Sequence, residues 1–235
     1  MVKGAPLSGL CASGLTCIKR DRILFEEFSL RLNAGELLYL RGPNGAGKTS
    51  LLRILTGLSV PESGVVTFNG EDIRHCSGAY YKQLIYLGHK SALNGALSAI
   101  DNLRFWMAQH SVESPGTEKQ STHQKSTHKK TTENHSDKIY SVLENLGLVG
   151  LEGVPVRFLS AGQQRRVALS RLWLKPAQVW ILDEPFTALD SSGITVLENT
   201  FKQHVANGGM IITTSHQPLS SMAGTHRTID LEYRF

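Results

Sequence analysis

The sequence predicts an α/β fold in which a mainly parallel core sheet is joined to an antiparallel β subdomain and an inserted helical subdomain. Continuous apolar runs at residues 36–40 (ELLYL), 179–182 (VWIL) and 210–214 (MIITT) are typical of buried strands with helices on both faces. Residues 15–40 include alternating apolar and polar side chains, the pattern of half-buried strands in an antiparallel sheet. Apolar residues at helical spacing lie between the runs.

The composition is that of a globular protein. The 235 residues suffice for one domain with a smaller insertion, and we assign residues 1–235 to a single domain. With 25 basic and 20 acidic residues the surface is mildly positive, which suits a membrane face or a nucleic acid and equally an ordinary protein surface. The three cysteines (Cys11, Cys17 and Cys76) lack metal-ligand spacing and predict reduced thiols. No apolar run approaches the ~18 residues that span a bilayer.

The predicted helices each carry an apolar stripe. The first follows Thr49, with a stripe formed by Leu51, Leu52, Leu55 and Leu58. Two more are predicted from Asp101 (DNLRFWMAQH) and from Ile139 (IYSVLENLGL). We assign these two to a helical subdomain at residues 90–160.

Residues 111–138 break this pattern. Val112 is their single aliphatic residue, and the triplet STH recurs at Ser121 and Ser126. Such a segment buries too little apolar surface to offset its ordering entropy, so a flexible surface loop is predicted. The alternative is a metal or heme site at its histidines (His123, His128 and His135), which we disfavour because a flexible tether lacks the partners that orient ligands.

The strongest motif is GPNGAGKTS at residues 42–50, which matches G-x-x-x-x-G-K-[ST] between a predicted strand and a predicted helix. Its glycines allow backbone N–H groups to encircle phosphate oxygens. Lys48 is placed to neutralise the β- and γ-phosphates, and the Thr49 hydroxyl to bind Mg²⁺. The predicted nucleotide-binding set is Gly42, Pro43, Asn44, Gly45, Ala46, Gly47, Lys48, Thr49 and Ser50.

Two acids follow the run VWIL. Asp183 comes at the carboxyl end of that predicted strand, where open α/β sheets bind nucleotides, and is predicted to bind Mg²⁺. Glu184 is predicted to orient a water molecule for in-line attack on the γ-phosphate. His216 follows the next apolar strand and is placed to donate a hydrogen bond to the γ-phosphate.

Three motifs, together with these two acids and His216, carry a family resemblance. They are the motif at residues 42–50, which is called the P-loop below, LSAGQ at 159–163 and TALD at 187–190. The chain resembles the ATP-binding subunits of ABC transporters. The resemblance implies a P-loop NTPase of the ABC ATPase type, with a RecA-like core, that hydrolyses ATP with Mg²⁺. It covers nearly the whole chain apart from residues 111–138, and Ala161 replaces the first glycine of the usual LSGGQ signature.

The LSAGQ motif raises a question of its own. A serine and glycine turn that opens a helix binds anions, yet one nucleotide in one subunit already has the P-loop. The resemblance implies the answer: two copies pair head to tail, and each signature closes on the ATP held by the other. The residues expected to act in trans are Ser160, Ala161, Gly162, Gln163 and Asp190.

The chain departs from the family pattern at two places. His89 stands where the family has a glutamine that touches Mg²⁺, the attacking water and the membrane subunit, and we expect it to take over a catalytic role. Family members usually carry an aromatic residue upstream of the P-loop, near CIKRDR (residues 17–22), that stacks on adenine, and this stretch has none. Lys19, Arg20 and Arg22 occupy that region, and a guanidinium plane of Arg20 or Arg22 is the candidate replacement.

The phrases YLGH, LSAGQQRRVALSRLWL and WILDEPFTALD resemble the branch of the family that serves cytochrome c maturation. This implies a peripheral protein on the cytoplasmic side of the bacterial inner membrane, bound to an integral membrane subunit and to further maturation proteins. ATP hydrolysis would then power heme export or the release of heme from its chaperone. No nucleic-acid partner is expected. The alternatives are an ABC exporter for another substrate, or a soluble ABC ATPase acting on ribosomes or nucleic acid.

Overall fold

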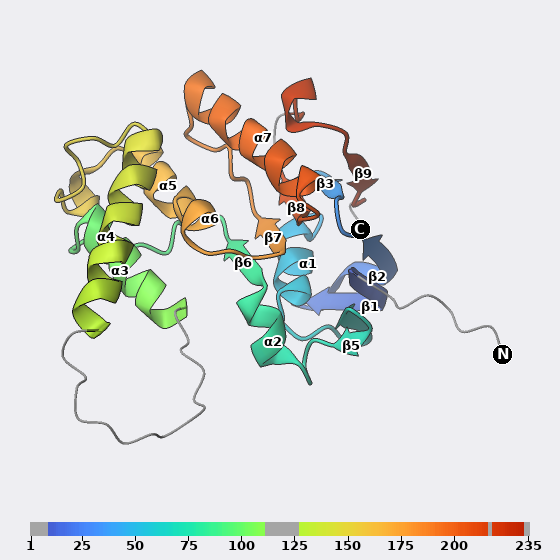
Figure 1. The fold of residues 1–235 in the computed structure, drawn as a ribbon. Coiled ribbons are helices and arrows are strands. Elements are labelled where there is room, and N and C mark those ends of the chain that lie inside the picture. The colour runs from blue at the N-terminus through green and yellow to red at the C-terminus, as the bar shows by residue number, and fades with distance from the viewer. Residues whose placement is uncertain (1–8, 111–126, 216–217, 233–235) are drawn as a thin grey trace, which may run out of the picture. The chain divides into compact units, whose positions relative to one another are not determined.

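The computed structural model describes residues 9–110, 127–215 and 218–232 (Figure 1). The chain forms two compact units. The core unit comprises the described residues of Met1–Lys90, Ala177–Thr187 and Ser191–Phe235, and the helical unit those of Ser91–Pro176 and Ala188–Asp190. No helix in the described ranges is long and apolar enough to cross a membrane.

A five-stranded parallel sheet organises the core unit. Its strand order is β6-β7-β8-β3-β9. The strands are β3 (Leu37–Arg41), β6 (Leu84–Leu87), β7 (Val179–Leu182), β8 (Met210–Thr214) and β9 (Arg227–Asp230). Every residue of β7 and β8 is buried, so the prediction of covered parallel strands is confirmed. The helices of this unit are α1 (Lys48–Leu55), α2 (Ser77–Lys82) and α7 (Ser191–Ala206), with the short 3₁₀ turn η2 (Ser221–Ala223).

The antiparallel subdomain has the strand order β2-β1-β4-β5. The strands are β1 (Leu10–Lys19), β2 (Arg22–Leu32), β4 (Ser63–Phe68) and β5 (Glu71–Asp72). Side chains from both sheets and from α1 share one apolar core, with Leu15, Leu38, Leu51 and Ile212 among its members. The small antiparallel sheet predicted from the alternating pattern is therefore confirmed.

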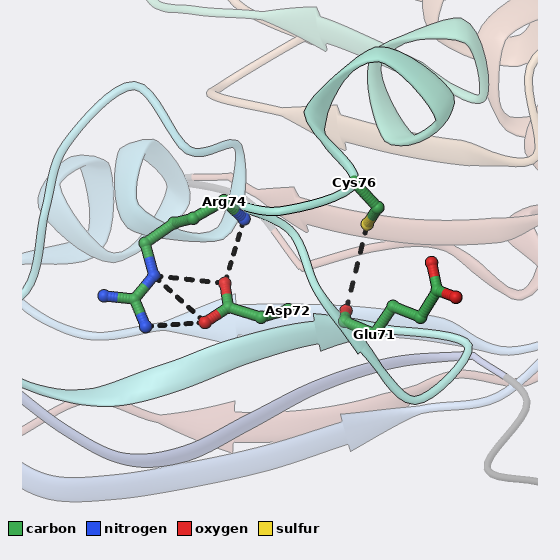
Figure 2. Close-up of polar contacts among 4 residues, drawn as sticks. All are labelled: Glu71, Asp72, Arg74 and Cys76. Carbon is green, nitrogen blue, oxygen red and sulfur yellow. Dashed lines mark hydrogen bonds and ion pairs between the residues drawn. The ribbon is translucent and has the colours of Figure 1, made fainter.

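The turn after β5 is fixed by an ion pair (Figure 2). The Arg74 side chain folds back on Asp72, with its Nη2 atom 2.6 Å from Oδ2, and its hydrogen bonds lower the pKa of Asp72 to about 2. The Sγ atom of Cys76 lies 4.0 Å from the carbonyl oxygen of Glu71. Cys76, Cys11 and Cys17 are all free thiols, as predicted.

One residue of the first predicted stripe does not belong to it. Leu51, Leu52 and Leu55 are buried, but 52% of Leu58 is exposed. Helix α1 ends at Leu55, and Gly57 follows with a φ of 74°, so the chain turns away before Leu58.

The helical unit contains α3 (Ala99–His110), α4 (Thr127–Asn145), η1 (Val156–Phe158), α5 (Ala161–Leu169) and α6 (Arg171–Leu174). Its own core includes Leu103 of α3, Leu143 of α4 and Val167 of α5. The unit continues to Pro176, past the expected boundary at residue 160, because α5 and α6 pack into the same core.

The expected loop at 111–138 is partly wrong. Helix α4 begins at Thr127, so residues 127–138 are helical, whereas residues 111–126, with His123, lie outside the described ranges. The apolar stripe at Ile139, Val142 and Leu143 anchors this helix, and its polar first turns extend from that anchor.

Candidate nucleotide-binding and hydrolytic site

The P-loop connects β3 to α1 through left-handed backbone. Gly42, Gly45 and Gly47 have φ values of 148°, 83° and 99°. A Cβ atom on Gly42 would lie 2.3 Å from the carbonyl oxygen of Leu231, so a side chain there would clash with backbone. Gly47 caps α1 without a side-chain hydrogen bond, which leaves the first N–H groups of the helix directed at an anion position.

The Lys48 side chain folds over the same loop. Its Nζ atom donates to the carbonyl oxygens of Gly42 at 2.6 Å and Pro43 at 3.0 Å. An ammonium group has three donors, so this geometry holds a positive charge at the mouth of the loop.

Thr49 and Asp183 come from distant parts of the sequence and meet at the carboxyl edge of the sheet. The Thr49 hydroxyl donates to Oδ2 of Asp183 at 2.8 Å, and the Thr214 hydroxyl donates to Oδ1 at 2.8 Å. Asp183 is buried. A hydroxyl and a carboxylate side by side form the hard oxygen donor set that Mg²⁺ prefers, so these residues fit the predicted ion.

Glu184 has an unusual backbone. Its φ is 51°, the left-handed region that a residue with a Cβ rarely adopts, and such strain often occurs at functional sites. Its N–H donates to the Thr214 hydroxyl at 2.8 Å. Its Oε2 atom lies 3.3 Å from Nδ1 of His89, so two of the three residues predicted to be catalytic are adjacent. The third, His216, lies outside the described residues.

The signature motif opens helix α5 of the helical unit with a capping box. The Ser160 hydroxyl accepts the N–H of Gln163 at 3.2 Å, and Oε1 of Gln163 accepts the N–H of Ser160 at 2.8 Å. Because Ser160 Oγ accepts in this cap, its own hydrogen stays available to a further acceptor. A Cβ atom on Gly162 would lie 2.6 Å from the carbonyl oxygen of Ala188, so the turn lies tightly against the TALD segment.

An open pocket joins the signature to Asp190. The lining residues are Gly147, Ser160, Gly162, Gln163, Arg166, Ala188 and Asp190. Nη2 of Arg166 lies 2.6 Å from Oδ1 of Asp190 and holds this carboxylate beside the signature turn. The pocket is therefore lined by four of the five residues expected to act in trans, Ser160, Gly162, Gln163 and Asp190, and Ala161 is not part of its lining.

The region expected to hold adenine is a tight hairpin between β1 and β2. Arg20 and Asp21 have φ values of 49° and 60°, and Lys19 pairs with Arg22 across the hairpin. A Cβ atom on Gly47 would lie 3.1 Å from the Cβ of Leu24 in β2, so this strand borders the P-loop.

Sequence reasoning missed Thr214 and Arg166. Thr214 forms the polar end of the apolar run MIITT, next to the strand that delivers Asp183, and that polar end was the available signal. Arg166 had no local signal, because its contact with Asp190 spans two distant segments.

Comparison with known proteins agrees with this geometry. The family profile described as ABC transporter matches residues 25–187. The chain is 44% identical over 225 residues to the cytochrome c biogenesis ATP-binding export protein CcmA of Idiomarina loihiensis, covering 96% of this chain and 93% of that protein. It is 44% identical over 220 residues to the protein of the same name from Yersinia pestis, covering 94% and 91% of the two chains.

Solved structures support the fold. The ATP-binding subunit of an ABC transporter superposes with a TM-score of 0.78 at 20% identity, covering 96% of this chain and 88% of that one. MJ0796, a bacterial ABC transporter cassette described as dimeric, superposes with a TM-score of 0.75 at 19% identity, covering 95% and 94%. The predicted ABC-type α/β fold is therefore confirmed, and the chain belongs to the ABC transporter family as an ABC-type ATPase similar over nearly its whole length to CcmA.

Proposed function

We propose that this chain is the ATP-hydrolysing subunit of a membrane transporter that serves cytochrome c maturation, and that hydrolysis powers heme export or the release of heme from its chaperone. The single observation that carries this proposal is the 44% identity, over 96% of the chain, to a relative named as a cytochrome c biogenesis export protein. The clustering of Lys48, Thr49, Asp183 and Glu184 supplies the hydrolytic chemistry that such a role needs.

The P-loop residues 42–50 bind the phosphates of ATP, with Lys48 directed at the β- and γ-phosphates. Thr49 and Asp183 would hold Mg²⁺. The Thr49 hydroxyl oxygen and the Asp183 carboxylate oxygen Oδ2, which would face the ion, lie 2.8 Å apart. When bound, the ion neutralises charge on the phosphates. Arg20 or Arg22 at the β1–β2 hairpin stacks on the adenine ring.

Glu184 positions the attacking water and accepts its proton during hydrolysis. The left-handed backbone at Glu184 aims its carboxylate, and the imidazole of His89, 3.3 Å away, steadies it. In this assignment His89 takes the place of the family glutamine. His216 donates a hydrogen bond to the γ-phosphate.

Two copies of the chain form the working enzyme. Ser160, Ala161, Gly162 and Gln163 of one copy close on the γ-phosphate bound by the other, and Asp190 lies at the same contact. The capping box supports this role, because it leaves the proton of the Ser160 hydroxyl available at the start of α5, the end of a helix that favours anions.

The subunit is peripheral on the cytoplasmic side of the inner membrane and binds an integral membrane partner. The test is complementation in its own host: after deletion of the gene, heme-stained c-type cytochromes are measured with the wild-type chain or Glu184→Gln supplied. We expect the wild-type chain alone to restore them. Normal cytochromes in the deletion strain, or equal rescue by both chains, would overturn the proposal.

A further inference from the structure

We propose that Thr214 is a positioning residue that fixes both acids of the hydrolytic site at once. Its hydroxyl donates to Oδ1 of Asp183 at 2.8 Å and accepts the N–H of Glu184, also at 2.8 Å. The inference rests on the roles proposed above for these two acids and adds a third residue that orients them.

The sheet register explains why Thr214 can reach both acids. Strands β7 and β8 are parallel neighbours in which Leu182 pairs with Thr213, so the next residue of each strand lies at the same carboxyl edge. Thr214 therefore lies beside Asp183, and it is completely buried. A valine would match its shape and its strand preference, so packing alone does not require a hydroxyl here.

The hydroxyl is used in both directions. It has one proton, which goes to Asp183, and its lone pairs accept the Glu184 N–H. The second bond matters because Glu184 has a φ of 51°, a conformation that costs energy for a residue with a side chain. The partly buried N–H of Glu184 also needs a hydrogen-bond acceptor, and Thr214 supplies one. The Thr214 side chain thus orients the Asp183 carboxylate and also holds the backbone that directs the Glu184 carboxylate.

Thr213 provides a matched control. It is equally buried on the same strand, but its hydroxyl bonds the carbonyl oxygen of Thr214 at 3.3 Å. Successive strand residues point to opposite faces, so Thr213 and Thr214 present their side chains to different surroundings.

The test compares Thr214→Val, Thr214→Ser and Thr213→Val in the full chain. We expect Thr214→Val to lower kcat about tenfold, equivalent to ~1.4 kcal/mol in the barrier, with little change in KM for ATP. Serine should restore most of the lost rate because it keeps the hydroxyl, and Thr213→Val should stay near the wild-type rate.

A second readout is independent of turnover. Mn²⁺ binding in the presence of ADP, followed by electron paramagnetic resonance, should weaken several-fold in Thr214→Val and stay unchanged in Thr213→Val. The reason is that Asp183 loses the hydrogen bond to its Oδ1 atom and keeps only the Thr49 bond to Oδ2 among the two hydroxyl contacts that orient its carboxylate.

Urea unfolding shows whether each variant is folded. If Thr214→Val does not fold, Thr214→Ala against Thr214→Ser isolates the hydroxyl in the same two assays. Equal kcat and Mn²⁺ affinity for the paired variants would overturn the role of Thr214. Glu184→Gln separates the two proposals, because wild-type turnover in that variant would refute the underlying site instead.

Discussion

The Nδ1 atom of His89 lies 3.3 Å from Oε2 of Glu184, so the residue that departs from the family pattern contacts the acid proposed to activate water. The contact is asymmetric: 65% of the His89 side chain is exposed, against 16% of Glu184. An exposed imidazole against a sheltered carboxylate is suited to steadying that carboxylate while remaining free to move when a partner binds.

His89→Ala should therefore lower kcat by roughly fivefold to tenfold, since Glu184 loses one positioning contact. His89→Gln should retain more activity than alanine, because its amide can donate to the same carboxylate. Steady-state phosphate release at saturating ATP measures both. Equal rates for alanine, glutamine and wild type would show that the contact has no role in turnover.

Glu184→Gln should reduce hydrolysis by about a hundredfold or more, since it removes the group that positions and deprotonates water. ATP binding should survive, so this variant should accumulate as an ATP-bound dimer in size-exclusion chromatography. Glu144→Gln, at an exposed position of α4, is the control for loss of one negative charge. A Glu184→Gln protein with wild-type turnover would refute the assignment.

Gly162→Val should abolish activity, because even a Cβ atom at this position would lie 2.6 Å from the carbonyl oxygen of Ala188. If the signature acts in trans, mixing Gly162→Val with Glu184→Gln restores activity. Half of the dimers are then mixed, and each has one site with an intact signature and an intact acid, giving about a quarter of the wild-type rate. A mixture that stays inactive would argue for action within one subunit.

The stability of the core unit should fall in mild acid because of His204. This ring stacks on Trp180 with centroids 3.7 Å apart, and burial lowers the pKa of His204 from 6.5 to about 4. The unfolded chain takes up a proton below about pH 6.5 and the folded chain only near pH 4. The contribution of His204 to the free energy of unfolding is therefore fully present above pH 6.5 and is lost as the pH falls from 6.5 to 4.

Urea unfolding at pH 7.5 and pH 5.0 measures this loss, which we expect to be about 1–2 kcal/mol after allowance for partial solvent screening. His204→Phe keeps a ring against Trp180 and cannot be protonated, so the difference between the two pH values should shrink by that amount. An unchanged difference would assign the acid sensitivity to other groups.

The elements that could be predicted well from the sequence are those with a strong local pattern. Strands β7 and β8 have the predicted bounds, because each is a short, mainly apolar run between polar segments and the change in polarity marks where the buried strand begins and ends. The start of α4 was missed because residues 127–138 are polar and the tertiary anchor that stabilises them begins at Ile139.

The site shows the same division. The P-loop and the acids after β7 follow motifs within one segment, so their residues could be named from the sequence. Thr214 and Arg166 act through partners 31 and 24 residues away, and such contacts depend on sheet order and on packing inside the helical unit. The prediction for Leu58 was wrong for a local reason, the left-handed turn at Gly57.

Lys48 is tied to the loop in which it sits, through the carbonyl oxygens of Gly42 and Pro43. Both oxygens carry partial negative charge, so the ammonium links two successive backbone carbonyl groups of the loop through its N–H donors. Replacing Lys48 by an uncharged residue would disturb the shape of the cradle as well as its charge. A dead Lys48 variant therefore cannot by itself report how much of the affinity for ATP comes from attraction between lysine and phosphate.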